Sequence, residues 1–160
     1  MGHEINIGLE ANEREGVVAL LQHNLADLHV LYIKSRNFHW NVVGPHFAEL
    51  HGFFEEQYDQ LEESIDEVAE RIRALGGVAT GSMEGFLKLA RLSESTGNPP
   101  NADAMIAELL ADHESIIRQL RLDLDTANDK YHDAGTGDFL TGLMEGHEKM
   151  AWMLRAHLAR

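Results

Sequence analysis

Cysteine is absent from this 160-residue chain, and proline occurs only three times. The lack of cysteine excludes disulfide bonds, thiolate metal sites and thiol nucleophiles. No apolar run approaches the roughly 18 residues that a membrane helix needs, and the N-terminus lacks the basic start and apolar block of a secretory signal. We therefore expect a cytoplasmic protein that does not span a membrane.

Basic residues are also scarce, since 13 Lys and Arg stand against 27 Asp and Glu, for a formal net charge of −14. Duplex DNA repels such a chain unless a local basic patch offsets the charge. Residues 1–15 contain only Arg14 among four glutamates, and the C-terminus offers only Arg155 and Arg160. We predict weak or absent DNA binding near neutral pH.

The length and the hydrophobic content of 44% are sufficient for one substantial core, so we expect a single domain over residues 1–160. Segment 1–11 precedes the first apolar stripe and is expected to be flexible. The hydrophobic periodicity is helical throughout, which predicts an all-α four-helix bundle. The long helices are expected at about 12–43, 45–75, 101–127 and 136–158.

Local signals set the ends of these helices. Pro45 suits a helix start, Gly76 suits a helix end, and Asn101 and Thr136 are the expected N-caps of the third and fourth long helices. The connection 78–100 is too long for a simple turn. It contains an apolar segment, 83–92, which predicts a short crossover helix between the second and third long helices.

Metal-ligand side chains recur at helical spacing in the second predicted helix. His51 and Glu55 are four residues apart, as are Asp66 and Glu70, so each pair can present two ligands from one face. Fifteen residues separate His51 from Asp66, which is about 22 Å along a helix. Ligand bonds to nitrogen or oxygen measure only about 2–2.6 Å. The two pairs therefore cannot meet within one helix.

His39 lies five residues before the Gly44–Pro45 break and His51 lies six residues after it, so an antiparallel hairpin makes these two histidines level. The carboxylates of Asp66 and Glu70 then lie at the far end of the hairpin. Two hairpins packed about a two-fold axis would bring opposite ends together and create two equal metal sites. The alternative is that the carboxylates belong to a solvated helix face and that His39 is a satisfied interfacial residue.

A di-iron site inside one subunit is not favoured, because no histidine has Glu three positions earlier, as ferritin-type bundles require. The other histidines are expected to be structural or solvated, with His147 beside Glu148 the one of most interest. They are His3, His23, His29, His46, His113, His132, His147 and His157.

The run Asn-Phe-His-Trp-Asn-Val at 37–42, His51 twelve residues after His39, and Asp-Glu-Val-Ala-Glu-Arg at 66–71 before Leu75-Gly-Gly resemble the Dps family. These mini-ferritins are named as DNA-binding proteins from starved cells, and the likeness covers nearly the whole chain. The resemblance implies a ferritin-like dodecameric shell. It also implies oxidation of Fe(II), preferentially by hydrogen peroxide, and storage of the ferric product as protection against oxidative stress.

Carried over from the family, the ferroxidase ligands would be His39 and His51 from one subunit and Asp66 and Glu70 from its partner, with Trp40 beside the centre. Glu55 stands where the family usually has Asp, so it would bind a metal with a carboxylate one methylene longer. Histidine and carboxylate ligands suit Fe(II) but also admit Zn(II) as a competing metal.

Three aspartates near the connection of the last two helices resemble the family's pore-lining residues, namely Asp129, Asp133 and Asp138. A carboxylate-lined opening would concentrate cations at the entrance of a shell, whereas a solvated polar loop explains the same residues. Two other functions remain open from sequence. One is a shell that binds metal without turnover, and the other is a nucleoid-associated protein that protects DNA.

Overall fold

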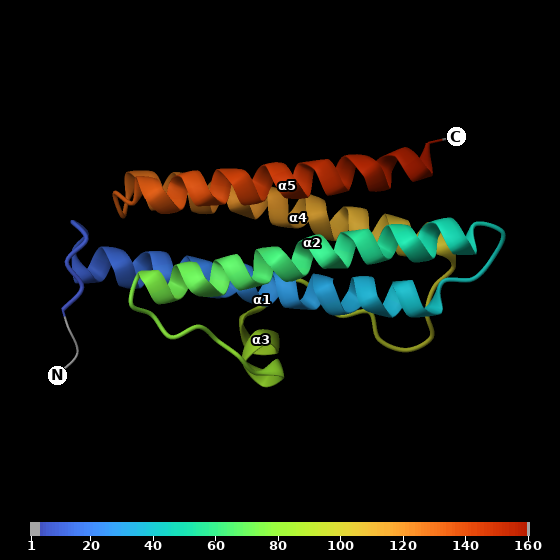
Figure 1. Cartoon of the computed structure of the whole chain (residues 1–160), viewed down its shortest axis with the longest axis horizontal. Helices are drawn as coiled ribbons and strands as arrows, with labels where there is room; N and C mark the ends of the chain where they lie inside the picture. The colour runs from blue at the N-terminus through green and yellow to red at the C-terminus, as the bar shows by residue number, and fades with distance from the viewer. Residues whose placement is uncertain (1–3, 160) are drawn as a thin grey trace.

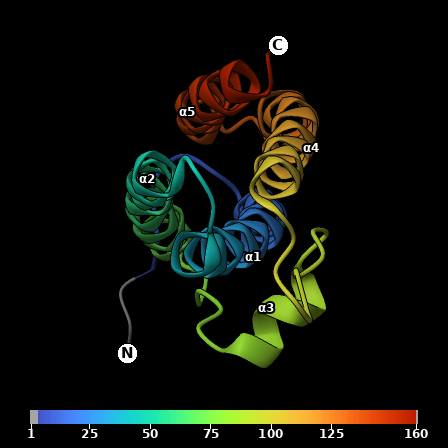
Figure 2. The same ribbon diagram turned by 90° about the vertical axis from the view of Figure 1, so that its right-hand side faces the viewer.

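The computed structural model describes residues 4–159, and these contain five helices and no strand. The helices are α1 (Ala11–Asn41), α2 (Phe47–Ala74), α3 (Met83–Leu89), α4 (Ala102–Asp129) and α5 (Ala134–Leu158). Four long helices run side by side, with α1 and α2 forming one hairpin and α4 and α5 the other (Figure 1). The end-on view shows the four in a bundle and α3 outside it, next to α1 (Figure 2).

The expected crossover helix is present as α3, within the long connection between α2 and α4. Its N-cap Ser82 accepts a hydrogen bond from the Gly85 N–H at 3.1 Å. The only buried residue of α3 is Phe86, whose ring stacks on His29 of α1 with the ring centres 3.7 Å apart. The crossover therefore packs on the outer face of the first hairpin.

The helix ends follow the sequence signals with two exceptions. Asn101 caps α4 as predicted, because its side chain accepts from the Ala104 N–H at 2.9 Å. Gly76 has φ +89° directly after α2, a conformation that disfavours side-chain-bearing residues. The second helix begins at Phe47, two residues later than Pro45, because Gly44 turns the chain with φ +120°.

The second exception is the N-cap of α5, where the prediction of Thr136 is wrong. Asp133 occupies the cap position, and its Oδ1 accepts from the Thr136 N–H at 2.9 Å while Oδ2 accepts from the Thr136 hydroxyl at 2.5 Å. Arg71 of α2 donates to both oxygens of this carboxylate at 3.3 and 3.4 Å. A carboxylate at a helix N-terminus is favoured by the helix dipole. Because Arg71 of α2 binds the same carboxylate, Asp133 also ties α5 to α2.

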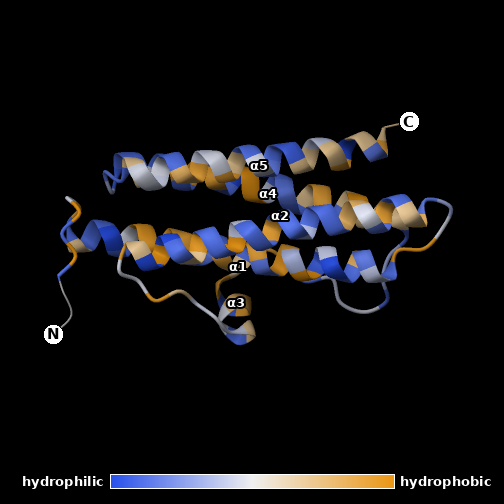
Figure 3. Ribbon diagram, viewed as in Figure 1, coloured by the Kyte–Doolittle hydropathy of each residue, from blue (hydrophilic) through white to orange (hydrophobic). Residues whose placement is uncertain are grey.

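The hydrophobic core lies between the four long helices, and apolar residues alternate with polar ones along each of them (Figure 3). Fully buried members include Leu21, Phe38, Phe54, Leu109 and Leu140. Residues 1–3 of the segment expected to be flexible lie outside the described residues, while Leu9 packs against the core. Within residues 4–159, none of the helices is both long enough and apolar enough to cross a membrane.

A buried polar network anchors the crossover segment to α1. Asp27, 2% exposed, accepts from the Arg91 N–H at 2.6 Å, from Arg91 Nε at 2.7 Å and from the Leu92 N–H at 3.1 Å. Asn24 links this network to α4, because it donates to Asp123 at 2.9 Å. The carboxylate of Asp27 is thus fully partnered, which is the condition under which a buried charge is tolerated.

We expect Asp27→Asn to lower the free energy of unfolding by about 2 kcal/mol, since hydrogen bonds to charged groups are worth about 1.5–3 kcal/mol and the amide retains part of the network. Urea unfolding at fixed protein concentration measures the change. Asp103→Asn serves as the control because Asp103 is on the surface of the first turn of α4, where we expect a much smaller effect. Equal effects of the two variants would contradict the anchoring role of Asp27.

Candidate metal centre

His39 and His51 lie at the turn-proximal end of the first hairpin, where α1 ends and α2 begins. Phe38 is fully buried in the core and holds the last turn of α1 in place, and the adjacent His39 is 8% exposed. The two imidazole rings stack with their centres 3.8 Å apart and an interplanar angle of 19°. The prediction that the hairpin makes these two histidines level is confirmed.

Reciprocal hydrogen bonds to the backbone determine which ring nitrogen is free. His39 Nδ1 lies 2.7 Å from the His51 carbonyl oxygen, and His51 Nδ1 lies 2.8 Å from the His39 carbonyl oxygen. A carbonyl oxygen only accepts, so each Nδ1 carries the proton and donates. In a neutral ring, Nε2 then keeps its lone pair, and this is how histidines are oriented and made more basic at metal sites.

Glu55 is exposed and lies one helical turn after His51 on α2. The Tyr58 hydroxyl is directed at Glu55 Oε1 at a distance of 3.5 Å, a weak contact, and the Tyr58 ring packs edge-on against His39 with the centres 5.3 Å apart. Desolvation, with the charges of Glu55 and Asp59 nearby, raises the pKa of Tyr58, so its hydroxyl stays a donor. Glu55 is thus connected to His39 only through Tyr58, and within residues 4–159 it does not form a metal-binding cluster with the two histidines.

Aromatic rings and one guanidinium flank the histidines. Arg36 lies over Tyr58 with its Cζ 4.9 Å from the ring centre and over Trp40 at 5.3 Å, and its Nη1 donates to the Tyr32 hydroxyl at 2.6 Å. Trp40 is 62% exposed in the single chain. Trp40 thus adjoins His39 in sequence and presents an open aromatic surface at this end of the hairpin.

Asp66 and Glu70 are exposed on the same continuous helix as His51, about 22 Å and about 28 Å further along it. Within residues 4–159 no three His, Asp or Glu side chains come together in a way that could hold a metal ion. One chain therefore places the histidine pair near one end of α2 and these two carboxylates near the other end.

The aspartates near the α4–α5 connection differ in environment. Asp129 and Asp138 are exposed, whereas Asp133 is 4% exposed and its carboxylate is already bonded to Thr136 and Arg71. Of these three aspartates, Asp129 and Asp138 therefore present exposed carboxylates on the single chain, and Asp133 does not.

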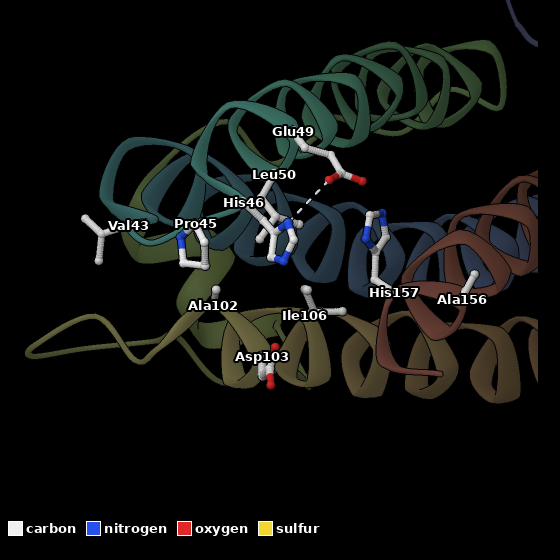
Figure 4. Close-up of a pocket in the computed structure, with 10 residues that line it drawn as sticks. All are labelled: Val43, Pro45, His46, Glu49, Leu50, Ala102, Asp103, Ile106, Ala156 and His157. Atoms are coloured by element: carbon white, nitrogen blue, oxygen red, sulfur yellow. Dashed lines mark ion pairs between the residues drawn. The ribbon is translucent and has the colours of Figure 1, made fainter. Parts of the chain in front are cut away.

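A pocket with a volume of ≈ 400 Å³ lies at the end of the bundle where the α1–α2 turn meets α4 and α5 (Figure 4). His46 and His157 face it together with Glu49, and Asp103 of α4 also belongs to its lining. His46 Nδ1 lies 3.8 Å from Glu49 Oε2, and both side chains are largely exposed. This open, solvated arrangement gives the pocket no preformed set of metal ligands.

Sequence reasoning missed a pair of buried histidines in the bundle core. His113 of α4 and His147 of α5 are both 0% exposed, with their Nδ1 atoms 2.9 Å apart. The helical spacing could have predicted their burial. His113 follows Leu109 by four residues and His147 follows Leu143 by four, so each histidine lies within the buried stripe of its helix.

Comparison with family models and solved structures identifies the fold class of this protein. The ferritin-like domain family matches residues 18–160. The structure superposes on Dps from Vibrio cholerae, described as a member of a broad superfamily of ferritin-like diiron-carboxylate proteins, with a TM-score of 0.91 and 32% identity over 99% of each chain. Dps from Thermosynechococcus elongatus gives a TM-score of 0.88 and 34% identity, covering 93% of this chain and 94% of that one. The protein has a ferritin-like all-α fold.

Sequence relatives specify the family further. An uncharacterized low temperature-induced protein of Nostoc is 53% identical over 154 residues, covering 96% of this chain and 86% of its own. The DNA protection during starvation protein 2 of Bacillus anthracis is 38% identical over 142 residues, covering 89% and 96%. The chain belongs to the Dps family, and the family membership predicted from its motifs is confirmed.

Proposed function

We propose that this protein is an iron-storing mini-ferritin whose ferroxidase centres are shared between two-fold-related subunits. His39, His51 and Glu55 of one subunit would bind Fe(II) together with Asp66 and Glu70 of the partner subunit. The observation that supports this most strongly is the reciprocal bonding of His39 and His51, which fixes the orientation of both imidazoles at a place where the chain has too few other ligands.

The proposed ligand set suits the oxidation of two Fe(II) ions by one peroxide. Each Fe(II) loses one electron, the O–O bond of hydrogen peroxide breaks on receiving both, and two protons complete two molecules of water. Carboxylates offset the rising positive charge at the metals, while the imidazoles supply nitrogen ligands. Pairing the electrons limits release of hydroxyl radical, and Trp40 would quench one-electron leakage beside His39.

Storage requires a shell, and we propose the dodecamer that the family resemblance implies, built from two-fold dimers and placed in the cytoplasm. The net charge of −14 favours the entry of cations. Asp129 and Asp138 would line the entry pore near the three-fold axis, and Asp133 would support it by holding α5 against Arg71. Zn(II) would compete at the same ligands.

DNA binding is proposed to be weak or absent near neutral pH, because the acidic chain opposes phosphate and its first residues are rich in glutamate. A nucleoid-associated role is therefore the lesser alternative, and a gel shift at low salt across a range of pH detects it. A shell that binds iron without turnover is the other alternative. Oxidation kinetics separate it from the ferroxidase.

Subunit mixing tests the shared centre directly. We expect the single variants His51→Ala and Asp66→Ala each to lose rapid peroxide-dependent Fe(II) oxidation. When equal amounts are co-assembled, a site is intact if its histidines come from the Asp66→Ala chain and its carboxylates from the His51→Ala chain. Random pairing makes this true for about one quarter of the sites, so about one quarter of the wild-type rate should return.

The matched control co-assembles His51→Ala with His39→Ala. Both changes fall in the same half of the site, so no pairing restores an intact centre and the rate should stay at the level of the single variants. Failure of the first mixture to regain activity, with both chains shown by mass spectrometry to share shells, would refute the shared centre.

A further inference from the structure

Three buried side-chain atoms in the described part of the chain lack a hydrogen-bond partner, namely Gln57 Oε1, His113 Nε2 and His147 Nε2. All three side chains are nearly or fully inaccessible, at 1%, 0% and 0% exposure. A pair of apolar side chains at the histidine positions would avoid the cost of burying polar atoms without partners. The three atoms therefore show that hydrogen-bonding capacity is left unused in the interior of the bundle, for the histidines on the ring side away from their Nδ1–Nδ1 contact.

The register of the bundle makes Gln57 level with the histidine pair. Five residues before His39 on α1, Lys34 Nζ donates to Asp112 of α4 at 2.6 Å, and Asp112 is adjacent to the buried histidine of that helix. His39 and His51 are level, and α1 and α2 run antiparallel, so the position on α2 that is level with Lys34 lies five residues after His51. That position is residue 56, next to Gln57. The offset of one residue is about 1.5 Å along the axis.

The geometry of the pair defines where an ion would bind. The Nδ1 atoms lie 2.9 Å apart while the ring centres are only 5.0 Å apart, so both nitrogens lie between the rings, close to the line that joins the centres. One proton lies between them, carried by one ring and accepted by the other. If that proton moves to the Nε2 of its own ring, two nitrogen lone pairs are directed along one line, which matches the ligand arrangement of a linear, two-coordinate cation.

The charge of the surroundings limits the kind of cation. Both imidazoles are neutral, since burial lowers the pKa of each, and the neighbouring Asp112 carboxylate is already paired with Lys34. Within residues 4–159 no third His, Asp or Glu joins the pair in a cluster that could hold a metal ion, and the cost of burying an ion rises with the square of its charge. A monovalent ion is therefore favoured over a divalent one, and among biological metals Cu(I) combines single charge with affinity for imidazole in two-coordinate sites.

We propose that His113 and His147 form a core site for one Cu(I) ion per chain, with Gln57 as its supporting residue. The ion takes the place of the shared proton between the Nδ1 atoms, and that proton moves to the Nε2 of its own ring, so no net proton is released and no electron is transferred. Gln57 Oε1 then accepts from one of the two Nε2–H groups, as partners of ligating histidines commonly do. With bonds of about 2 Å, the rings must separate by about 1 Å.

This site is independent of the proposed ferroxidase centre, and the test removes that centre. The assembled His39→Ala/His51→Ala variant is titrated with Cu(I) under anaerobic conditions against a competing Cu(I) chelator. We expect it to retain one Cu(I) per chain, and the further changes His113→Phe and His147→Leu to abolish that retention. The control adds His46→Ala and His157→Ala, the exposed histidines of Figure 4, and should leave retention unchanged.

X-ray absorption of the Cu(I)-loaded His39→Ala/His51→Ala variant keeps the proposal testable even if the core variant fails to fold. Two nitrogen scatterers and the pre-edge feature of two-coordinate Cu(I) support it. Three or four scatterers, or no retained Cu(I), overturn it. Co(II) is added to the same variant in a separate arm, and tetrahedral cobalt bands without Cu(I) retention would also overturn it, because they would define a different, divalent site.

Discussion

Replacing His51 with alanine is expected to slow the initial rate of peroxide-dependent Fe(II) oxidation at least about 100-fold. The change removes a proposed ligand and also removes the carbonyl-directed bond from the His51 ring that orients the pair. Loss of partners that merely orient a ligand already costs about 10–100-fold in affinity or activity, and loss of the ligand itself costs at least as much. Stopped-flow absorbance at two Fe(II) per peroxide measures the rate.

Assembly should survive this change, because His51 is only half-buried and lies at the edge of the core. His46→Ala is the matched control on the same stretch of chain, since His46 is exposed and makes one long contact with Glu49. An unchanged rate in the His51 variant, with a shell of normal size by light scattering, would exclude His51 from the iron site.

Variants of Glu55 distinguish the proposed ferroxidase from a shell that binds metal without turnover. If Glu55 is a ligand, Glu55→Ala should resemble the His51 variant, while Glu55→Asp, which restores the residue usual in the family, should keep most of the rate. Radical trapping during the reaction adds a second readout, since paired electron transfer releases little hydroxyl radical. A slow native protein that Glu55→Asp accelerates would identify the longer side chain as the cause of poor turnover.

Acid is expected to destabilise the fold through the buried histidine pair. Burial lowers the pKa of His147 from 6.5 to about 4, and burial together with the charge of His147 lowers the pKa of His113 in the same direction. Above pH 6.5 both histidines are neutral whether the chain is folded or unfolded, so they add no pH dependence. Below pH 6.5 these histidines bind protons in the unfolded chain but not in the folded chain, so the free energy of unfolding falls.

For His147 alone, the fall between pH 6.5 and about 4 amounts to about 3 kcal/mol, at 1.36 kcal/mol for each pKa unit. It levels off below pH 4, where the folded chain is also protonated, and His113 adds to it. Urea unfolding at a series of pH values and one chain concentration measures the trend.

The variant His113→Phe/His147→Leu is the control for the acid prediction. It keeps the carboxylates and the exposed histidines, whose contributions therefore cancel when the two pH profiles are subtracted. The difference should grow as pH falls from 6.5 to 4 and should favour the variant. Parallel profiles would show that the pair is not kept neutral by burial.

Much of this protein follows from local patterns in its sequence. The four long helices, the short crossover helix and the Asn101 cap were predictable, because hydrophobic spacing and capping residues act within a few positions of the chain. The level placement of His39 and His51 was also predictable, since helical rise and a short break leave little freedom. The separation of His51 from Asp66 was predictable as well, because it follows from the rise per residue along one helix.

Only the tertiary structure decided how distant groups meet. Asp133, and not Thr136, caps α5, because Arg71 from another helix completes the bonding of the buried carboxylate. The tautomers of His39 and His51 depend on carbonyl oxygens twelve residues away, which no local pattern specifies.

The carboxylate half of the proposed iron site stays a prediction, because its partners would lie on a second copy of the chain. The pairing of His113 with His147 is the clearest case of tertiary control, since it joins residues 34 positions apart. The sequence by itself determined the helices, the family and the separation of His39 and His51 from Asp66 and Glu70, the two halves of the proposed metal site. The folded chain determined burial, tautomer and charge state, because these depend on contacts between helices and not on spacing within one.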